Sequence, residues 1–150
     1  MRREVAVALA LAAAAASCKR DRDGEPPPKP GAALPKPLAG KAFYRLDVGP
    51  QTPCTAGAPC EARLVLTALG AYHVDQRYPV QFVSDPVEGV TVDGTGAFAL
   101  EDARSGTLTL RFRAARRGAA RFAGTFKLRV CAGEQCEIEE PRIEFELPVT

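Results

Sequence analysis

Two cysteines near the end of the chain, Cys131 and Cys136, are the residues best suited to chemistry. Cys131 ends an alternating apolar segment, Cys136 begins the next one, and four residues lie between them. So short a connection brings the two sulfurs across from each other in a hairpin, which makes a disulfide geometrically natural. Such a pair either exchanges disulfides with a partner through a mixed disulfide or acts as a structural staple.

The charges in the hairpin sequence favour the staple. A reactive cysteine needs positive neighbours that stabilise its thiolate, and nearby carboxylates raise the pKa of a thiol. Four glutamates crowd the hairpin against two arginines, namely Glu134, Glu137, Glu139 and Glu140 against Arg129 and Arg142. We therefore expect a structural disulfide rather than a redox switch, with no cofactor.

Cys54 and Cys60 form a second candidate pair, in a segment bounded by Pro53 and Pro59. If Cys18 is set aside, four cysteines remain, which allow three connectivities, and the close spacings make 54–60 and 131–136 the simplest. An even set is typical of an oxidising compartment. A zinc site is not expected, because the spacings of five and four residues are not typical of zinc ligands and His73 is the only histidine.

Other catalytic patterns are weak. Ser84-Asp85 lacks the Gly-x-Ser-x-Gly context of a hydrolase, and Gly94-Thr95-Gly96 follows no strand-to-helix pattern that would cradle a phosphate. Tyr72, His73 and Tyr78 could line a binding groove, although aromatic residues of a sandwich belong more often to its core. No catalytic residue and no nucleotide site is expected.

Cys18 closes a segment that is typical of export. Arg2 and Arg3 precede an alanine- and leucine-rich run from Val5 to Ala16, and Ser17 precedes the cysteine. This ending resembles the lipobox of bacterial lipoproteins, which implies cleavage after residue 17, lipidation of Cys18 and a membrane anchor in the cell envelope. The alternatives are a secreted protein cut nearby and an uncut short anchor, although the run is shorter than the roughly 20 residues of a spanning helix.

Residues 18–41 are expected to be a flexible spacer. Segment 19–41 holds six of the 13 prolines and few large apolar residues, so it cannot bury enough surface to fold. The spacer is basic, with six Lys/Arg against three Asp/Glu, whereas 42–150 has 12 basic and 14 acidic residues. A near-neutral domain of this kind gives no indication of a nucleic-acid partner.

The cysteine pairs must be positioned by strands, because apolar residues of 42–150 recur at every second position. Examples are Leu64, Leu66 and Ala68; Leu108, Leu110 and Phe112; Phe126, Leu128 and Val130; Ile143, Phe145, Leu147 and Val149. We expect strands near 42–48, 61–69, 79–84, 89–92, 97–101, 106–114, 120–131 and 136–149, the last interrupted at Glu140-Pro141. Seven or eight strands in one domain predict an all-β, immunoglobulin-like antiparallel sandwich.

Two motifs in this domain resemble a known family. Gly70-Ala71-Tyr72-His73-Val74-Asp75 looks like the G-Y-H-I-N segment of the periplasmic N-terminal domain of the thiol:disulfide interchange protein DsbD and its relatives. The later stretch from Gly124 to Cys131, followed by Cys136, looks like the cysteine-bearing strand of that family. The resemblance implies an immunoglobulin-like sandwich over roughly 61–149, a redox pair at Cys131 and Cys136, and a thioredoxin-like partner.

The sequence therefore supports two functions of different classes. The favoured one is an envelope lipoprotein whose disulfide-stapled sandwich binds a protein partner or has a structural role. The alternative is a periplasmic thiol–disulfide exchange domain that uses Cys131 and Cys136, as the resemblance implies.

Overall fold

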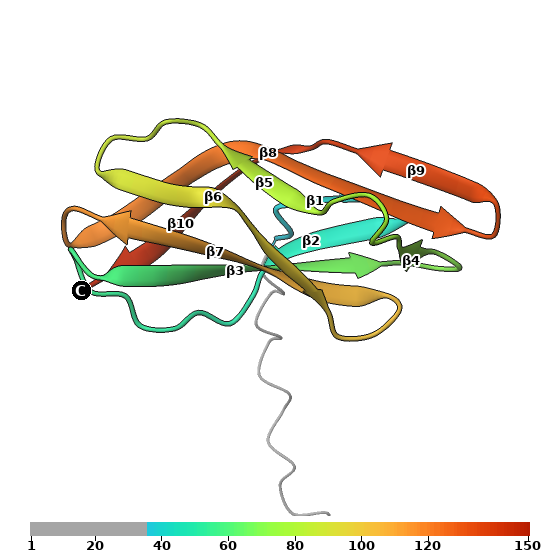
Figure 1. Cartoon of the computed structure of the whole chain (residues 1–150), viewed down its shortest axis with the longest axis horizontal. Helices are drawn as coiled ribbons and strands as arrows, with labels where there is room; N and C mark the ends of the chain where they lie inside the picture. Colours follow the sequence, from blue (N-terminus) through green and yellow to red (C-terminus); the bar gives the residue numbers. More distant parts are fainter. Residues whose placement is uncertain (1–35) are drawn as a thin grey trace, which may run out of the picture. The chain divides into compact units, whose positions relative to one another are not determined.

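The computed structural model describes residues 36–150, which form two antiparallel β-sheets packed together, with no helix in this part of the chain (Figure 1). The predicted signal peptide 1–17, the lipidation site Cys18 and most of the predicted spacer lie outside the described residues. Within 36–150 there is no helix long and apolar enough to cross a membrane. The predicted all-β sandwich is confirmed.

The first sheet has five strands in the order β1-β2-β3-β7-β6. These are β1 (Ala39–Lys41), β2 (Tyr44–Val48), β3 (Pro59–Ala68), β7 (Ser105–Ala114) and β6 (Val90–Leu100). The second sheet is built around one long strand, β8 (Gly118–Ala132). On one side β8 pairs with β10 (Arg142–Val149) and β9 (Gln135–Glu139), and on the other with β5 (Gln81–Ser84) and β4 (His73–Val74).

The expected strands are present, with three differences. The segments 89–92 and 97–101 belong to one strand, β6, whose register shifts between Asp93 and Ala97 in a bulge. Strand β1 lies in the last three residues of the predicted spacer, because Leu38 and Ala39 pack against the core and the backbone of 39–41 pairs with β2. The two-residue strand β4 has too short a pattern to be recognised from sequence.

The alternating residues that predicted the strands form the core. Leu64, Leu66, Leu108, Leu110, Phe126 and Leu128 are completely buried. Between the sheets, Phe112 of β7 meets Phe122 of β8 edge to face at 4.9 Å between ring centroids, and Phe122 stacks on Phe145 of β10 at 4.7 Å. Because these rings come from both sheets, they join the two layers directly.

The strand order can be compared with that of immunoglobulin-type sandwiches. With β2 taken as the first strand, the sheets β2-β3-β7-β6 and β5-β8-β10 follow the ABED and CFG orders of immunoglobulin-type sandwiches. This agreement supports the immunoglobulin-like assignment, which stays a prediction.

Candidate functional site

The first candidate site is the hairpin formed by β8 and β9. Ala132 pairs with Gln135, so only Gly133 and Glu134 form the turn. Gly133 has a φ of +58°, a left-handed conformation that glycine adopts without a steric penalty, as the first position of a tight hairpin turn requires. The turn therefore fixes the register that places Cys131 directly opposite Cys136.

Both cysteine pairs adopt the simplest connectivity. Cys131 and Cys136 form a disulfide with a Cα–Cα distance of 4.0 Å, and Cys54 and Cys60 form one with 5.3 Å. Cys131 is buried with 2% of its surface exposed, whereas Cys136 is half-buried. The sulfur of Cys136 is therefore the one that a partner would reach first.

His73 extends the cysteine pair into a row across three strands. It pairs with Cys131 from β4, on the side of β8 opposite to Cys136. Residues directly opposite each other in a sheet share a face, with Cβ atoms about 5 Å apart. His73, Cys131 and Cys136 therefore lie side by side on the outer face of the second sheet, because neighbouring Val130 points into the core.

A buried carboxylate, Asp75, lies beside this row. Its Oδ1 accepts hydrogen bonds from the backbone N–H and Nε of Arg77, and its Oδ2 accepts one from Nη2 of Arg77. Oδ2 also lies 3.6 Å from Sγ of Cys131 and 3.5 Å from Nε of Arg129. The hydrogen bonds from Arg77 hold the pKa of Asp75 below its ordinary value, so Asp75 is an anion at neutral pH.

The position of Asp75 changes the electrostatic argument about the cysteines. Glu137 and Glu139 alternate with Cys136 along β9, and they pair with Val130 and Leu128, so they lie on the opposite face from the sulfurs. Glu139 is bound instead by Lys41 of β1 at 2.7 Å. The carboxylate that contacts Cys131 is therefore that of Asp75, which is 56 residues away and which no pattern in the sequence linked to the cysteines.

The charge of Asp75 has a consequence for disulfide exchange. If a partner thiolate attacked the more accessible sulfur of Cys136, Cys131 would leave as a thiolate. That thiolate would form 3.6 Å from the Asp75 carboxylate, and the repulsion disfavours it. Arg129 and Arg77 offset part of this repulsion, but both already face the carboxylate.

The three residues of the predicted groove lie in different surroundings. Tyr72 packs against Phe43, with 5.3 Å between ring centroids. His73 is exposed beside Cys131, and the hydroxyl of Tyr78 donates to Glu140 at 3.3 Å. The predicted groove of these three residues stays a prediction.

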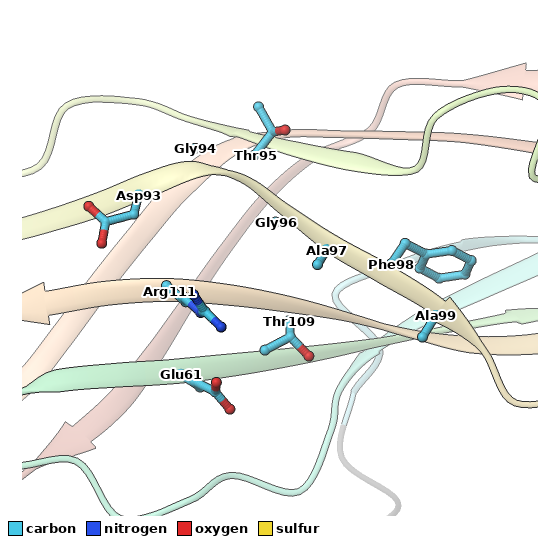
Figure 2. A pocket seen from close by; sticks show the side chains of 10 residues that line it. All are labelled: Glu61, Asp93, Gly94, Thr95, Gly96, Ala97, Phe98, Ala99, Thr109 and Arg111. Carbon is cyan, nitrogen blue, oxygen red and sulfur yellow. The ribbon is translucent and has the colours of Figure 1, made fainter.

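The second candidate site is a shallow hollow of about 520 Å³ on the outer face of the first sheet. Figure 2 shows Glu61 and Arg111 reaching out from β3 and β7 beside the bulged part of β6. At the bulge, Gly96 has a φ of +92°, and a Cβ on it would lie 2.8 Å from the Leu110 side chain. The lining residues are Glu61, Asp93, Gly94, Thr95, Gly96, Ala97, Phe98, Ala99, Thr109 and Arg111.

The hollow combines a charged row with small side chains. Glu61, Arg111 and Asp93 lie directly opposite one another on three neighbouring strands, with Arg111 in the middle. Next to this row, Thr109 pairs with Ala97. Their small side chains rise less far above the sheet than those of Glu61 and Arg111, and this forms the floor of the hollow. Such an arrangement can accept a protruding side chain of a partner and bind its polar groups. Sequence reasoning missed it because it depends on the bulge in β6.

Among residues 36–150, one group of side chains is placed so that it could hold a metal ion. Ligand atoms of Asp75, Cys131 and Cys136 all lie within 4.8 Å of one another. In the oxidised protein the two sulfurs are joined to each other. No family model, no curated protein and no solved structure matches this chain.

Proposed function

We propose that the protein is a lipid-anchored binding module of the bacterial cell envelope. Its disulfide-stapled sandwich binds another envelope protein through the hollow over β3, β7 and β6. The anchor is a lipid on Cys18, supported by the export-type segment before it and by the even set of four paired cysteines, which is typical of an oxidising compartment.

The hollow is the observation that carries this proposal. It lies on an outer sheet face, and the small residues in its lining, such as Gly94, Gly96 and Ala97, let a partner approach the backbone closely. Arg111 is exposed there and, among residues 36–150, makes no salt bridge or side-chain hydrogen bond. An arginine in such a place is a frequent contributor to protein interfaces.

The test uses cross-linking in native membranes followed by identification of the captured protein. Arg111→Ala should weaken capture, and Thr109→Arg should abolish it because a long side chain fills the hollow. Arg117→Ala, which changes an exposed arginine in the turn before β8, is the matched control and should capture normally. Equal capture by all three variants would overturn the proposed surface. Mass spectrometry of the mature N-terminus tests the anchor separately, because a chain that begins elsewhere or carries no lipid contradicts it.

Thiol–disulfide exchange is the second candidate, favoured by the accessibility of Cys136 and by the sequence resemblance to the DsbD N-terminal domain. A thioredoxin-like partner would attack Sγ of Cys136 and release Cys131. The Asp75 carboxylate opposes that release, which is why we place exchange second.

Two measurements separate the candidates. A structural disulfide typically has a reduction potential below about −300 mV, whereas an exchange-competent one lies higher. In addition, Cys131→Ser leaves Cys136 free to form a lasting mixed disulfide, with Cys136→Ser as its counterpart. A low potential and no trapped partner with either variant would exclude exchange. A higher potential together with a trapped thioredoxin-like protein would make thiol–disulfide exchange the favoured function.

A further inference from the structure

We propose that the hairpin becomes a zinc site when the Cys131–Cys136 disulfide is reduced. The ligands are the two thiolates and Oδ2 of Asp75, and the imidazole of His73 completes the set. The zinc site lies on the second sheet, whereas the proposed binding surface lies on the first. The inference therefore does not rest on the proposed function.

One distance between two of the ligand atoms already fits zinc, and a third ligand atom lies close to both. Zinc binds sulfur at about 2.3 Å and carboxylate oxygen at about 2.1 Å in tetrahedral sites, which separates neighbouring ligand atoms by roughly 3.6 Å. Sγ of Cys131 lies 3.6 Å from Oδ2 of Asp75. All three ligand atoms are within 4.8 Å of one another, although the sulfurs are still bonded. On reduction the sulfur–sulfur distance has to increase, and the His73 side chain, which is not part of this cluster, has to turn toward it.

The separation of the two cysteine sulfurs requires no movement of the backbone. The cysteines are directly opposite each other, with Cα atoms 4.0 Å apart, and the two-residue turn fixes their register. Once the S–S bond is broken, rotation about each Cα–Cβ bond can separate the sulfurs to the distance that zinc needs. Because Cys136 is half-buried rather than buried, the ion has access from solvent.

Asp75 is held in the orientation that a ligand needs. Arg77 donates two hydrogen bonds to Oδ1 and only one, at 3.2 Å, to Oδ2, the oxygen that faces Cys131. A second group that orients a metal-binding carboxylate is a usual feature of metal sites. The three anionic ligands also neutralise the two charges of Zn²⁺ and the charge of one of the two nearby arginines, Arg77 and Arg129.

His73 supplies the fourth position from the other neighbouring strand. It is exposed and pairs with Cys131 on the same outer face, so its ring can turn over the sulfur. Two sulfurs, one nitrogen and one oxygen form a mixed set, which suits zinc better than Cu(I), because Cu(I) prefers sulfur ligands alone.

The chemistry balances with a dithiol or a phosphine as reductant. Two electrons from the reductant break the S–S bond, and two protons convert the sulfurs to thiols. A dithiol becomes a disulfide, whereas a phosphine takes up oxygen from water and becomes a phosphine oxide. Zn²⁺ then replaces the two thiol protons. Oxidation of the thiols would release the ion, so the site is gated by redox state.

The test uses the full chain with Cys54→Ser and Cys60→Ser, so that the hairpin cysteines are the only pair. After reduction with a phosphine under inert gas, Co²⁺ is added as a spectroscopic probe. We expect one equivalent to give a thiolate-to-cobalt charge-transfer band that Zn²⁺ removes, and the unreduced protein to give none. Circular dichroism of the reduced protein checks that the strands persist.

Single substitutions then test each ligand. Asp75→Asn and His73→Gln should each weaken binding at least about tenfold, and Cys131→Ser should remove the band. Asp47→Asn, in β2 of the other sheet, is the matched control and should leave Co²⁺ binding unchanged. Absence of the band in the reduced protein, or binding unaffected by Cys131→Ser, would overturn the site. Unchanged affinity in both Asp75→Asn and His73→Gln would overturn the ligand set.

An independent readout needs no spectroscopic probe and no substitution. In the reduced native sequence, Zn²⁺ should slow alkylation of Cys131 and Cys136 by iodoacetamide but leave Cys54 and Cys60 unprotected. The second pair serves as the internal control because no His, Asp or Glu side chain forms a ligand cluster with it among residues 36–150. Equal alkylation of both pairs with and without Zn²⁺ would contradict the proposal.

Discussion

The carboxylate of Asp75 is 6% exposed, accepts three hydrogen bonds from Arg77 and lies within ion-pair distance of Arg129. A buried acid with these partners stabilises the fold only while it is ionised, because its protonated form keeps the burial and loses most of the attraction. Asp75 therefore connects the turn after β4 to the end of β8. Because this connection depends on the charge of Asp75, the stability of the region around the hairpin should depend on pH.

Acid should destabilise the domain partly through Asp75. Its pKa is lowered in the fold, chiefly by the Arg77 side chain, so its contribution is present above the unfolded pKa of about 3.9 and is lost as pH falls through the folded value. Urea midpoints measured from neutral to acidic pH should fall less steeply in Asp75→Asn than in the native protein. Asp93→Asn is the control and should follow the native curve. Equal slopes for all three proteins would show that Asp75 contributes nothing.

Alkali should destabilise the domain partly through Tyr44. Its pKa is raised first by burial and then by the charge of Glu139, so the folded state favours the neutral phenol. The resulting stability is present below the unfolded pKa of about 10 and is lost as pH rises through the folded value. Tyr44→Phe should flatten the alkaline fall of the urea midpoint, whereas Tyr78→Phe should not. A Tyr44→Phe curve as steep as the native one would refute this.

At the scale of the element, period-two alternation predicted most strands correctly, because a sandwich strand buries every second side chain. The pattern in β10, where Ile143, Phe145, Leu147 and Val149 are buried between exposed neighbours, is a clear example. Alternation could not show that 89–92 and 97–101 form one strand, since the bulge at 94–96 inserts residues that break the period. Strand β4 was missed because two residues contain no period.

The site around Cys131 and Cys136 was predictable only in part, because sequence patterns show local spacing but not contacts between residues distant in the chain. The Cys131–Cys136 pair follows from local spacing, because four residues admit only a tight connection. His73 and Asp75 reach the pair through the pairing of β4 with β8, which joins residues more than 50 positions apart. The glutamates of β9 misled the electrostatic argument, since composition counts charges without assigning them to a face.

Each of the two disulfides should contribute to the free energy of unfolding of the domain. Each closes a loop of six or seven residues, and the loop-entropy relation gives about 2 kcal/mol of stabilisation for each. Cys131→Ala/Cys136→Ala and Cys54→Ala/Cys60→Ala should each lower the free energy of unfolding by about that amount in urea. A loss near zero for either pair would mean that the hairpin or loop is fixed without its disulfide.

The second pair should also show a local effect. The backbone carbonyl of Cys54 accepts hydrogen bonds from the backbone N–H and the side-chain hydroxyl of Thr150. The Cys54–Cys60 loop therefore holds the end of β10. Hydrogen exchange at the Thr150 amide should accelerate in Cys54→Ala/Cys60→Ala and stay unchanged in Cys131→Ala/Cys136→Ala, which lies at the other end of β8.

At the scale of the whole described domain, the two sheets are joined mainly by apolar side chains. Phe112 comes from the first sheet, whereas Phe122 and Phe145 come from the second, and Phe122 contacts both of the others. Apart from those of the buried Asp75, the ion pairs lie at or near the surface, as with Arg121–Glu146 and Lys127–Glu140. Exposed pairs of this kind contribute little, so the packing of the sheets depends on the rings.

Phe122→Ala should therefore destabilise the domain more than the loss of either disulfide. Removing a buried phenylalanine typically costs about 3–5 kcal/mol, roughly a fifth or more of the 5–15 kcal/mol that stabilises a domain. Phe122 is 2% exposed and touches rings of both sheets, so the neighbours cannot close the cavity without separating the layers. Urea unfolding followed by circular dichroism should show this loss, whereas Val83→Ala, at a site 42% exposed, should change the midpoint little. If both variants unfolded at the native urea concentration, the aromatic cluster would not be what holds the sheets together.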